Sequence, residues 1–146
     1  MNKIISKEQF SEKVFKLEIE APLIAKSRRA GHFVIVRVDE KGERMPLTIA
    51  GSNLEKGTIT LVVQTVGLSS TKLCNLNEGD YVLDVVGPLG QATHIQNYGT
   101  VVCAGGGVGV APMLPIIQAL KAAGNRVISV LAGRSKDLII LENEVR

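Results

Sequence analysis

Hydrophobic and polar residues alternate along the first half of the chain with a period close to two. In VFKLEIE, Phe15, Leu17 and Ile19 fall on one face and charged residues on the other, which is typical of a half-buried strand. HFVIVRV, TITLVVQTV and YVLDVVGPLG also predict strands, and the polar connectors DEKGE and NLEKG are typical of hairpins. With SSTKLCNL as its only short helical window, this region predicts a closed antiparallel barrel of six strands.

The pattern changes near Tyr98. The segment TVVCAGGGVGVAPMLPIIQALKAAGNRVISVLAGRS predicts a strand, a glycine-rich turn, a helix that Gly124 ends, and a second strand. Val101 and Val102 are expected to form a short buried run. A spacing of about 25 residues between the two strands suits a parallel crossover. SKDLIILENEVR predicts a further helix with Ser135 as its N-cap.

These patterns divide the chain into two parts. We expect residues 1–97 to form a barrel domain and residues 98–146 to form the first βαβ unit of a nucleotide-binding domain. A doubly wound sheet needs several more strands, so the second part is expected to be incomplete and the chain to be a piece of a longer protein. Such a piece should self-associate through an exposed apolar sheet edge, which would include Val101, Val102, Val127, Ile128, Val130 and Leu131.

Composition narrows the function classes. An apolar fraction of 45% with 21% charged residues is that of a soluble globular domain. The net charge is +3, but only Arg28 and Arg29 are adjacent basic residues, and aromatic residues make up 3% of the chain with no Trp. Basic blocks and aromatic stacking platforms, which nucleic-acid binding needs, are therefore missing. There is no apolar stretch of membrane-spanning length and no signal peptide, which predicts a cytoplasmic protein.

Cysteines and histidines predict no metal site. Cys74 and Cys103 lie in different predicted regions and are too few for a metal knuckle or an iron–sulfur cluster, so we expect two free buried thiols. His32 is predicted to be a barrel-edge residue, and His94 has no visible partner.

The run AGGGVGVAP carries the clearest chemistry. Its glycines follow a predicted strand and precede a predicted helix, so the backbone can approach a pyrophosphate at a helix N-terminus. Pro112 falls in the first helical turn, where a missing N–H costs nothing. Val110 holds the place of the last Gly of G-x-G-x-x-G, so this is not the standard dinucleotide fingerprint. A tight turn explains one glycine but not four, which makes this run the candidate phosphate site: Gly105, Gly106, Gly107, Val108 and Gly109.

Four motifs, GHFV, RMPLTI, GPLG and GGGVGVAPMLP, occur in this order along the chain. The whole chain thereby resembles the ferredoxin–NADP reductase superfamily. Within it, the chain is similar to the branch of the dihydroorotate dehydrogenase electron-transfer subunit and of the NADH-dependent reduced ferredoxin:NADP oxidoreductase small subunit, often called sulfide dehydrogenase. The resemblance implies FAD on the barrel, NAD(P)H on the second domain and hydride transfer between nicotinamide and flavin N5. It also implies a larger flavin- or iron–sulfur-bearing subunit and a ferredoxin-type carrier as partners, with a [2Fe–2S] cluster only beyond Arg146.

The resemblance also implies the flavin site. Pro46, Leu47 and Thr48 would border the isoalloxazine, with Thr48 near N5. The superfamily's phosphate-binding Arg aligns with Met45, one place after Arg44. Arg44 is therefore interpreted either as a phosphate ligand or as a solvated hairpin residue.

A second flavin segment would follow in the next strand. The resemblance implies that Val62, Val63 and Gln64 line the FAD and that a short helix beginning at Gly67, Ser69 and Ser70 points at its pyrophosphate. An ordinary Ser-capped helix is the alternative. Arg134 would contact the adenosine part of the nicotinamide nucleotide or would only precede a helix.

Several choices stay open at this level. PLT in RMPLT favours the ferredoxin:NADP type over the dihydroorotate dehydrogenase subunit. NADH and NADPH are not distinguished, because the third strand of the nucleotide domain is absent. We expect weak or no productive NAD(P)H oxidation by this chain alone. A non-enzymatic barrel that binds a partner is the hypothesis of another class, and it would be colourless where a flavoprotein is yellow.

Overall fold

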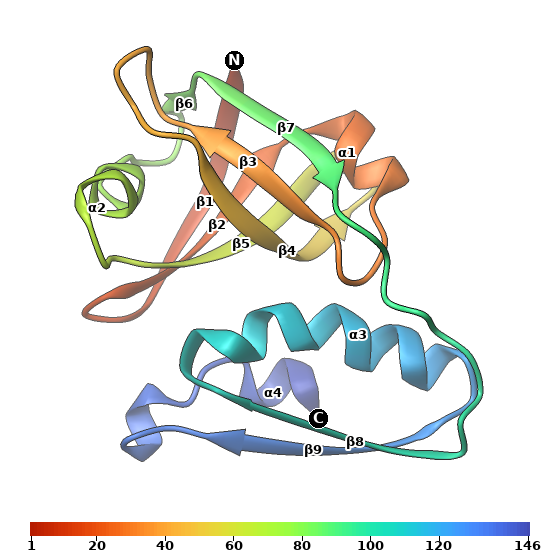
Figure 1. The fold of residues 1–146 in the computed structure, drawn as a ribbon. Coiled ribbons are helices and arrows are strands. Elements are labelled where there is room, and N and C mark those ends of the chain that lie inside the picture. Colours follow the sequence, from red (N-terminus) through yellow and green to blue (C-terminus); the bar gives the residue numbers. More distant parts are fainter.

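The computed structural model describes residues 1–146 and places a barrel beside a smaller α/β unit (Figure 1). The barrel is one antiparallel sheet in the order β6-β1-β2-β5-β4-β3-β7. Its strands are β1 (Asn2–Ser11), β2 (Val14–Glu20), β3 (Phe33–Arg37), β4 (Met45–Asn53), β5 (Thr58–Gln64), β6 (Tyr81–Val82) and β7 (Asp84–Leu89).

The two edge strands of this sheet, β6 and β7, follow one another directly along the chain. β6 pairs with β1 and β7 pairs with β3, although only Leu83 separates β6 from β7. The N–H of Leu83 donates to the carbonyl of Val38 at 3.0 Å. The sheet is therefore nearly closed, as expected. The expected count of six strands was wrong, because YVLDVVGPLG crosses from one sheet edge to the other and forms two strands.

Alternation along the strands fills the barrel interior. Leu17 and Ile19 of β2, Val34 and Val36 of β3 and Ile49 of β4 belong to one cluster of 16 buried residues. Helix α2 (Leu68–Cys74) covers part of this core, which confirms the predicted helical window.

Helix α1 (Pro22–Ser27) was not predicted. It begins with a proline, which favours a helix start, and it buries Ile24 and Ala25. A helix of 6 residues is too short to show a helical period in the sequence, which is why the pattern missed it.

The α/β unit follows the predicted order of elements. It consists of β8 (Thr100–Gly106), the 3₁₀ turn η1 (Gly107–Gly109), α3 (Val110–Ala122), β9 (Arg126–Ala132), the 3₁₀ turn η2 (Lys136–Leu138) and α4 (Glu142–Val145). β8 and β9 are parallel, with Thr100 opposite Arg126, and Gly124 follows the end of α3 with φ of 93°. The predicted crossover and helix stop are thus confirmed.

Two details of this unit differ from expectation. Val102 is 63% exposed because α3 covers only one face of the β8–β9 pair, so the expected buried run was wrong at that residue (Figure 1). The segment after Ser135 forms the single turn η2 instead of a continuous helix. The chain is then extended at Ile139, and α4 begins only after Leu141, whose φ is 58°.

A buried asparagine ties the linker to the α/β unit. The Oδ1 atom of Asn125 accepts from the backbone N–H groups of Tyr98 (2.6 Å) and Gly99 (3.0 Å). Its Nδ2 donates to the carbonyls of Gln96 and Leu120, both at 2.9 Å. All four hydrogen-bonding positions of this amide are therefore used, and the linker is fixed against the end of α3.

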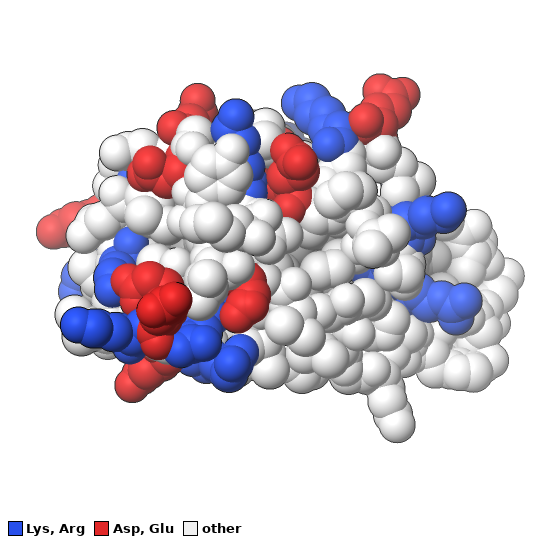
Figure 2. Space-filling model, turned by 90° about the horizontal axis from the view of Figure 1, so that it is seen from above, with Lys and Arg blue, Asp and Glu red and all other residues white.

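Charged residues are intermixed on the barrel face shown in Figure 2, where no continuous basic surface is visible. The helices are all too short or too polar to cross a bilayer.

Candidate functional site

The glycine turn between β8 and α3 has both structural and open positions. Gly107 has φ of 55°, and a Cβ on Gly105 would lie 3.2 Å from the Sδ of Met113. The backbone conformation of Gly107 therefore favours glycine, whereas a side chain at Gly105 would need the flexible end of Met113 to shift by a few tenths of an ångström. Gly109 has φ of −62°, and a Cβ there would meet no atom within 4 Å. Neither reason applies to Gly109, which leaves open space over the start of a helix of 13 residues.

A cleft of about 770 Å³ lies beside this turn, between the barrel and the α/β unit. Five of the predicted site residues line it: Gln64, Gly106, Gly107, Val108 and Arg134. The barrel also contributes the β1–β2 turn, from Ser11 to Val14, which the sequence did not indicate as part of a site. The predicted nucleotide turn and one end of the predicted flavin strand thus meet in one cleft.

The RMPLT segment divides between the two faces of β4. Met45 and Leu47 are half-buried and pack against the barrel core, so Pro46 and Thr48 lie on the outer face. The guanidinium of Arg44 lies 3.7 Å from the carboxylate of Asp84 at the start of β7. Its side chain is 58% exposed, which leaves it accessible on the barrel surface.

The three β5 residues are not equivalent. Val63 is 1% exposed and lies in the barrel core, so only its backbone is available to a ligand. Val62 packs against the core of the α/β unit, and Gln64 is exposed at the cleft.

The start of α2 is a serine cap. The Oγ atom of Ser70 accepts from the N–H groups of Val66 (3.0 Å) and Gly67 (3.1 Å), and it donates to the carbonyl of Gly67 (3.2 Å). The hydroxyl of Ser69 donates to the carboxylate of Glu43 at 3.0 Å. A Cβ on Gly67 would meet no atom within 4 Å, so this glycine also leaves open space.

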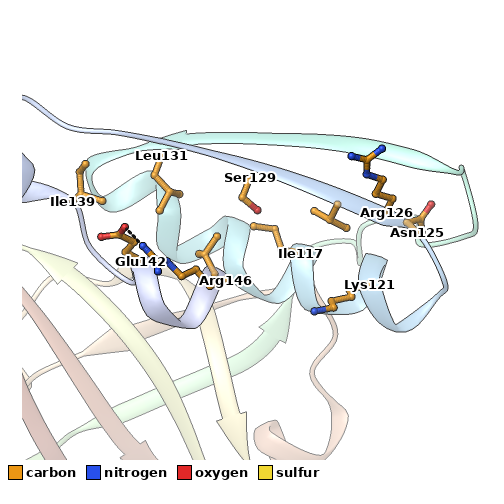
Figure 3. Close-up of a pocket in the computed structure, with 11 residues that line it drawn as sticks. Ile117, Lys121, Asn125, Arg126, Ser129, Leu131, Ile139, Glu142 and Arg146 are labelled. Carbon is orange, nitrogen blue, oxygen red and sulfur yellow. Dashed lines mark hydrogen bonds and ion pairs between the residues drawn. The ribbon is translucent and has the colours of Figure 1, made fainter.

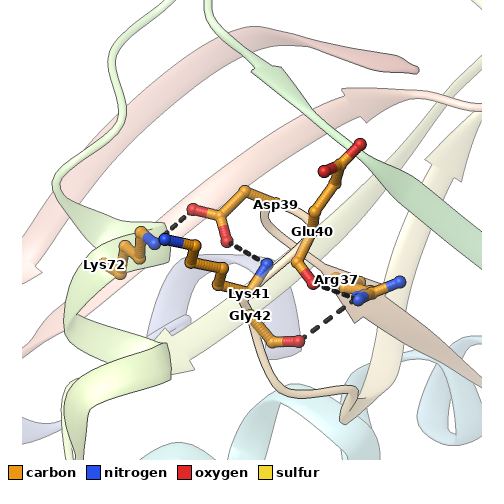
Figure 4. A network of polar contacts seen from close by, with 6 residues as sticks. All are labelled: Arg37, Asp39, Glu40, Lys41, Gly42 and Lys72. Atoms are coloured by element: carbon orange, nitrogen blue, oxygen red, sulfur yellow. Dashed lines mark hydrogen bonds and ion pairs between the residues drawn. The ribbon is translucent and has the colours of Figure 1, made fainter.

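The β3–β4 hairpin is held against α2 by a polar network (Figure 4). Lys72 of α2 pairs with Asp39, and this hydrogen bond holds the pKa of Asp39 below its usual range. The guanidinium of Arg37 donates to the carbonyls of Glu40 and Gly42 within the hairpin. These contacts bring the hairpin beside the helix that carries Ser69.

A second hollow, of about 650 Å³, lies between α3, β9 and α4 (Figure 3). Asn125 and Arg126 line one end, and the ion pair of Glu142 with Arg146 (2.8 Å) lines the other. It contains none of the predicted site residues.

The remaining candidate residues have structural surroundings. The Nδ1 atom of His32 accepts from the N–H of Arg29 at 2.9 Å and so supports a turn at the barrel edge. Cys74 and Cys103 are free and buried, and burial raises the pKa of Cys74 to about 11. No three His, Cys, Asp or Glu side chains gather where they could hold a metal ion.

Comparison with known proteins gives two relatives that cover the whole chain. The dihydroorotate dehydrogenase B (NAD(+)) electron transfer subunit homolog of Thermotoga maritima is 46% identical over 146 residues, which are 100% of this chain and 52% of that protein. A chain of the NADH-dependent reduced ferredoxin-NADP oxidoreductase, studied for flavin-based electron bifurcation, superposes with a TM-score of 0.96 at 46% identity, over 100% of this chain and 53% of that one.

More distant proteins share the fold. Phthalate dioxygenase reductase superposes with a TM-score of 0.83 at 23% identity, over 99% of this chain and 47% of that one. The electron transfer subunit of dihydroorotate dehydrogenase B from Streptococcus pneumoniae is 29% identical over 148 residues, 98% of this chain and 57% of that protein.

The chain spans about half the length of the relatives that it matches. Residues 2–94, which contain the barrel and both predicted flavin segments, match the oxidoreductase FAD-binding domain family. The chain therefore belongs to this family, and its barrel is the family's domain.

Proposed function

We propose that this chain is the FAD-binding half of an electron-transfer flavoprotein, with FAD on the barrel (residues 1–97) and NAD(P)H at the glycine turn of residues 98–146. The observation that carries this proposal is the cleft in which Gln64 of β5 lies with Gly106, Gly107 and Val108. Hydride transfer requires the two cofactors to meet, and a cleft shared by both parts of the chain provides that place.

The residues present fit both groups. Gly67 and Gly109 each leave open space where a side chain would stand, at the starts of α2 and α3. Backbone N–H groups at a helix start suit phosphate oxygens. We propose that Arg44, Gly67 and Ser69 hold the phosphates of FAD and that Ser70 shapes the turn through its cap. Arg134 and the glycine turn, including Gly105, would hold the nicotinamide nucleotide.

The flavin, when bound, supplies hydride and electron transfer, and the protein orients it. The outer face of β4 presents Pro46 and the Thr48 hydroxyl, which we propose lie along the ring, with Leu47 and Val62 as apolar support. Val63 would contribute its backbone. Hydride transfer needs no acid–base side chain, and we assign no such role to Glu12, the one carboxylate that lines the cleft.

The whole protein would pass electrons between NAD(P)H, FAD and iron–sulfur partners. Relatives named as a ferredoxin-NADP oxidoreductase and as a dihydroorotate dehydrogenase electron transfer subunit favour two versions of this role. Identity does not separate them, because a ferredoxin-NADP oxidoreductase chain and a dihydroorotate dehydrogenase B electron transfer subunit homolog are each 46% identical to this chain. The PLT of RMPLT favours the ferredoxin type. A ferredoxin-type carrier and a larger flavin- or iron–sulfur-bearing subunit would then be the partners, with any [2Fe–2S] cluster held outside residues 1–146.

The test begins with the cofactor. Purified chain should be yellow and should release FAD on denaturation, as identified by chromatography. Thr48→Ala should shift the flavin reduction potential, whereas Thr60→Ala on the neighbouring strand should not. Finding neither FAD nor FMN, even after reconstitution, would refute the proposal in favour of a barrel that only binds a partner.

A further inference from the structure

We propose that Lys13, in the β1–β2 turn of the barrel, contacts the diphosphate of the nicotinamide dinucleotide. The inference rests on the proposed role of the glycine turn as a nucleotide site. It adds a residue from the barrel, distant in sequence from that turn, to the binding site.

The β1–β2 turn is anchored to the α/β unit. Phe10 and Val14, on either side of the turn, pack against the hydrophobic cluster that contains Val110 and Ile140. Neither residue is buried in the barrel interior. The end of this hairpin thus extends past the barrel core and lies against the second part of the chain.

The turn backbone is also fixed from the barrel side. The carbonyl of Lys13 accepts from the N–H of Thr65 at 2.8 Å and from its hydroxyl at 3.3 Å. Thr65 directly follows Gln64, which lines the same cleft. Lys13 is therefore presented at the cleft by a turn held on both sides, which lowers the entropy lost when its ammonium meets an anion.

The charges that line the cleft favour a diphosphate. Its only basic residues are Lys13 and Arg134, and its only acidic residue is Glu12. Neither basic side chain makes an ion pair, because the four ion pairs of the chain involve other residues. One cation comes from the barrel and the other from the segment after β9, so both sides of the cleft offer an uncommitted positive charge.

The position of the cleft favours the nicotinamide dinucleotide over FAD as the source of the diphosphate. The lining residues include the glycine turn and Arg134 but no residue of β4 or α2, where the FAD phosphates are proposed to lie. Only Gln64 of the lining residues comes from a proposed flavin segment, so a diphosphate between Lys13 and Gly107 would lie away from the residues proposed to hold the FAD phosphates.

The experiment is calorimetric titration of the FAD-loaded chain with NAD⁺ and NADP⁺, up to millimolar concentration and at two salt concentrations. Lys13→Ala should raise the Kd about tenfold, as expected for one charge-assisted contact, and should weaken its salt dependence. Lys13→Arg should restore most of the affinity. Lys56→Ala, which removes an exposed lysine from the β4–β5 turn, should leave the Kd unchanged.

Each result has a distinct meaning. Unchanged nucleotide affinity in Lys13→Ala would overturn the inference and leave the proposed function standing. Loss of FAD instead of nucleotide would also overturn it, because Lys13 would then belong to the flavin site. If the unmodified chain bound neither nucleotide, both the nucleotide part of the proposed function and this inference would fall.

Discussion

Ile49 and Ala50 are neighbours in β4 but belong to different hydrophobic cores, Ile49 to that of the barrel and Ala50 to that of the α/β unit. Ile49 pairs with Leu61 of β5, whereas Gly51 pairs with Thr60, so Ala50 is the extra residue of a β-bulge. The bulge places a small side chain at the contact between β4 and α3.

This arrangement predicts that both residues matter for stability, for opposite reasons. Ile49→Ala leaves a cavity in the barrel and should lower the free energy of unfolding by about 2–5 kcal/mol. Ala50→Leu overfills the contact with α3 and should lower it by about 1–3 kcal/mol. Urea denaturation followed by circular dichroism measures both, and a fully stable Ala50→Leu would contradict close packing of α3 on β4.

Asn125 should be among the most sensitive polar residues. Asn125→Leu removes four hydrogen bonds, and the N–H of Tyr98 loses its acceptor, whereas the N–H of Gly99 keeps the Oδ1 of Asn97 at 3.0 Å. We expect the free energy of unfolding to fall by about 1–3 kcal/mol, the usual cost of leaving one polar group unpaired. Asn53→Ala is the control, since its amide oxygen accepts one bond from Lys56 in an exposed turn. Equal urea midpoints for both variants would show that the Asn125 contacts contribute little.

Two glycines of the same turn should behave differently. Gly107→Ala forces a side chain onto a φ of 55° and should lower stability by about 1–2 kcal/mol. Gly109→Ala fills open space at an ordinary helical φ, so stability should be unchanged while NAD⁺ and NADP⁺ bind more weakly. Thermal unfolding and calorimetric titration separate the two effects. Unchanged nucleotide affinity in Gly109→Ala would count against phosphate binding at this turn.

The thiols predict a loss of stability at alkaline pH. Burial raises the pKa of Cys74 to about 11, above the value of about 8.5 for an unfolded chain. The Cys74 thiol of the unfolded chain therefore loses its proton at a lower pH than that of the folded chain. The stability gained from the neutral buried thiol is complete below about pH 8.5 and is lost as the pH rises toward 11. Denaturation at several pH values should show a shallower decline for Cys74→Ala. An identical decline would mean that the Cys74 thiol titrates normally.

The open face of the β8–β9 pair predicts self-association of the chain. Val102, Ile128 and Val130 are 63%, 41% and 49% exposed on that face. The other three residues expected on this surface, Val101, Val127 and Leu131, pack against the core beneath α3 instead, because successive residues of a strand face opposite sides. Parallel sheets are almost always covered on both faces. Light scattering over a concentration series should therefore show a rising mass, which Val130→Glu abolishes and Leu23→Glu, on the exposed side of α1, does not. A strict monomer at high concentration would refute this expectation.

The sequence predicted most elements because their patterns are long and regular. The β-branched runs and the helix around Leu114 follow from periodicity alone. The split of YVLDVVGPLG into two strands at Leu83 was not predictable. Local alternation of apolar and polar residues carries no information about which strand each half pairs with. Helix α1 was missed for its shortness.

The candidate site was likewise predicted only in part from the sequence. The glycine turn was predicted because its spacing has a local chemical meaning, and the cleft does bring Gly107 and Arg134 together. Lys13, which lines the cleft, was not predicted because an isolated turn lysine has no distinguishing pattern. The one signal in the sequence is that Phe10 and Val14 are apolar on both sides of a charged turn, which indicates that this hairpin packs against another part of the chain. Val63 was predicted to line the FAD, but its side chain lies in the barrel core because it alternates with Val62 on opposite faces of β5.

The crossing at Leu83 has a consequence for synthesis on the ribosome. On the edge of β1 that faces away from β2, Asn2 and Lys3 pair with Val82 and Tyr81 of β6. The first strand to emerge therefore keeps an open edge until almost the whole barrel has been translated. The parallel pairing of β8 with β9, by contrast, joins residues 100–106 to residues 126–132, although α3 also packs on β4 of the barrel. A nascent chain paused before Tyr81 would thus be the species that most needs a chaperone, and the barrel would become protected in one late step.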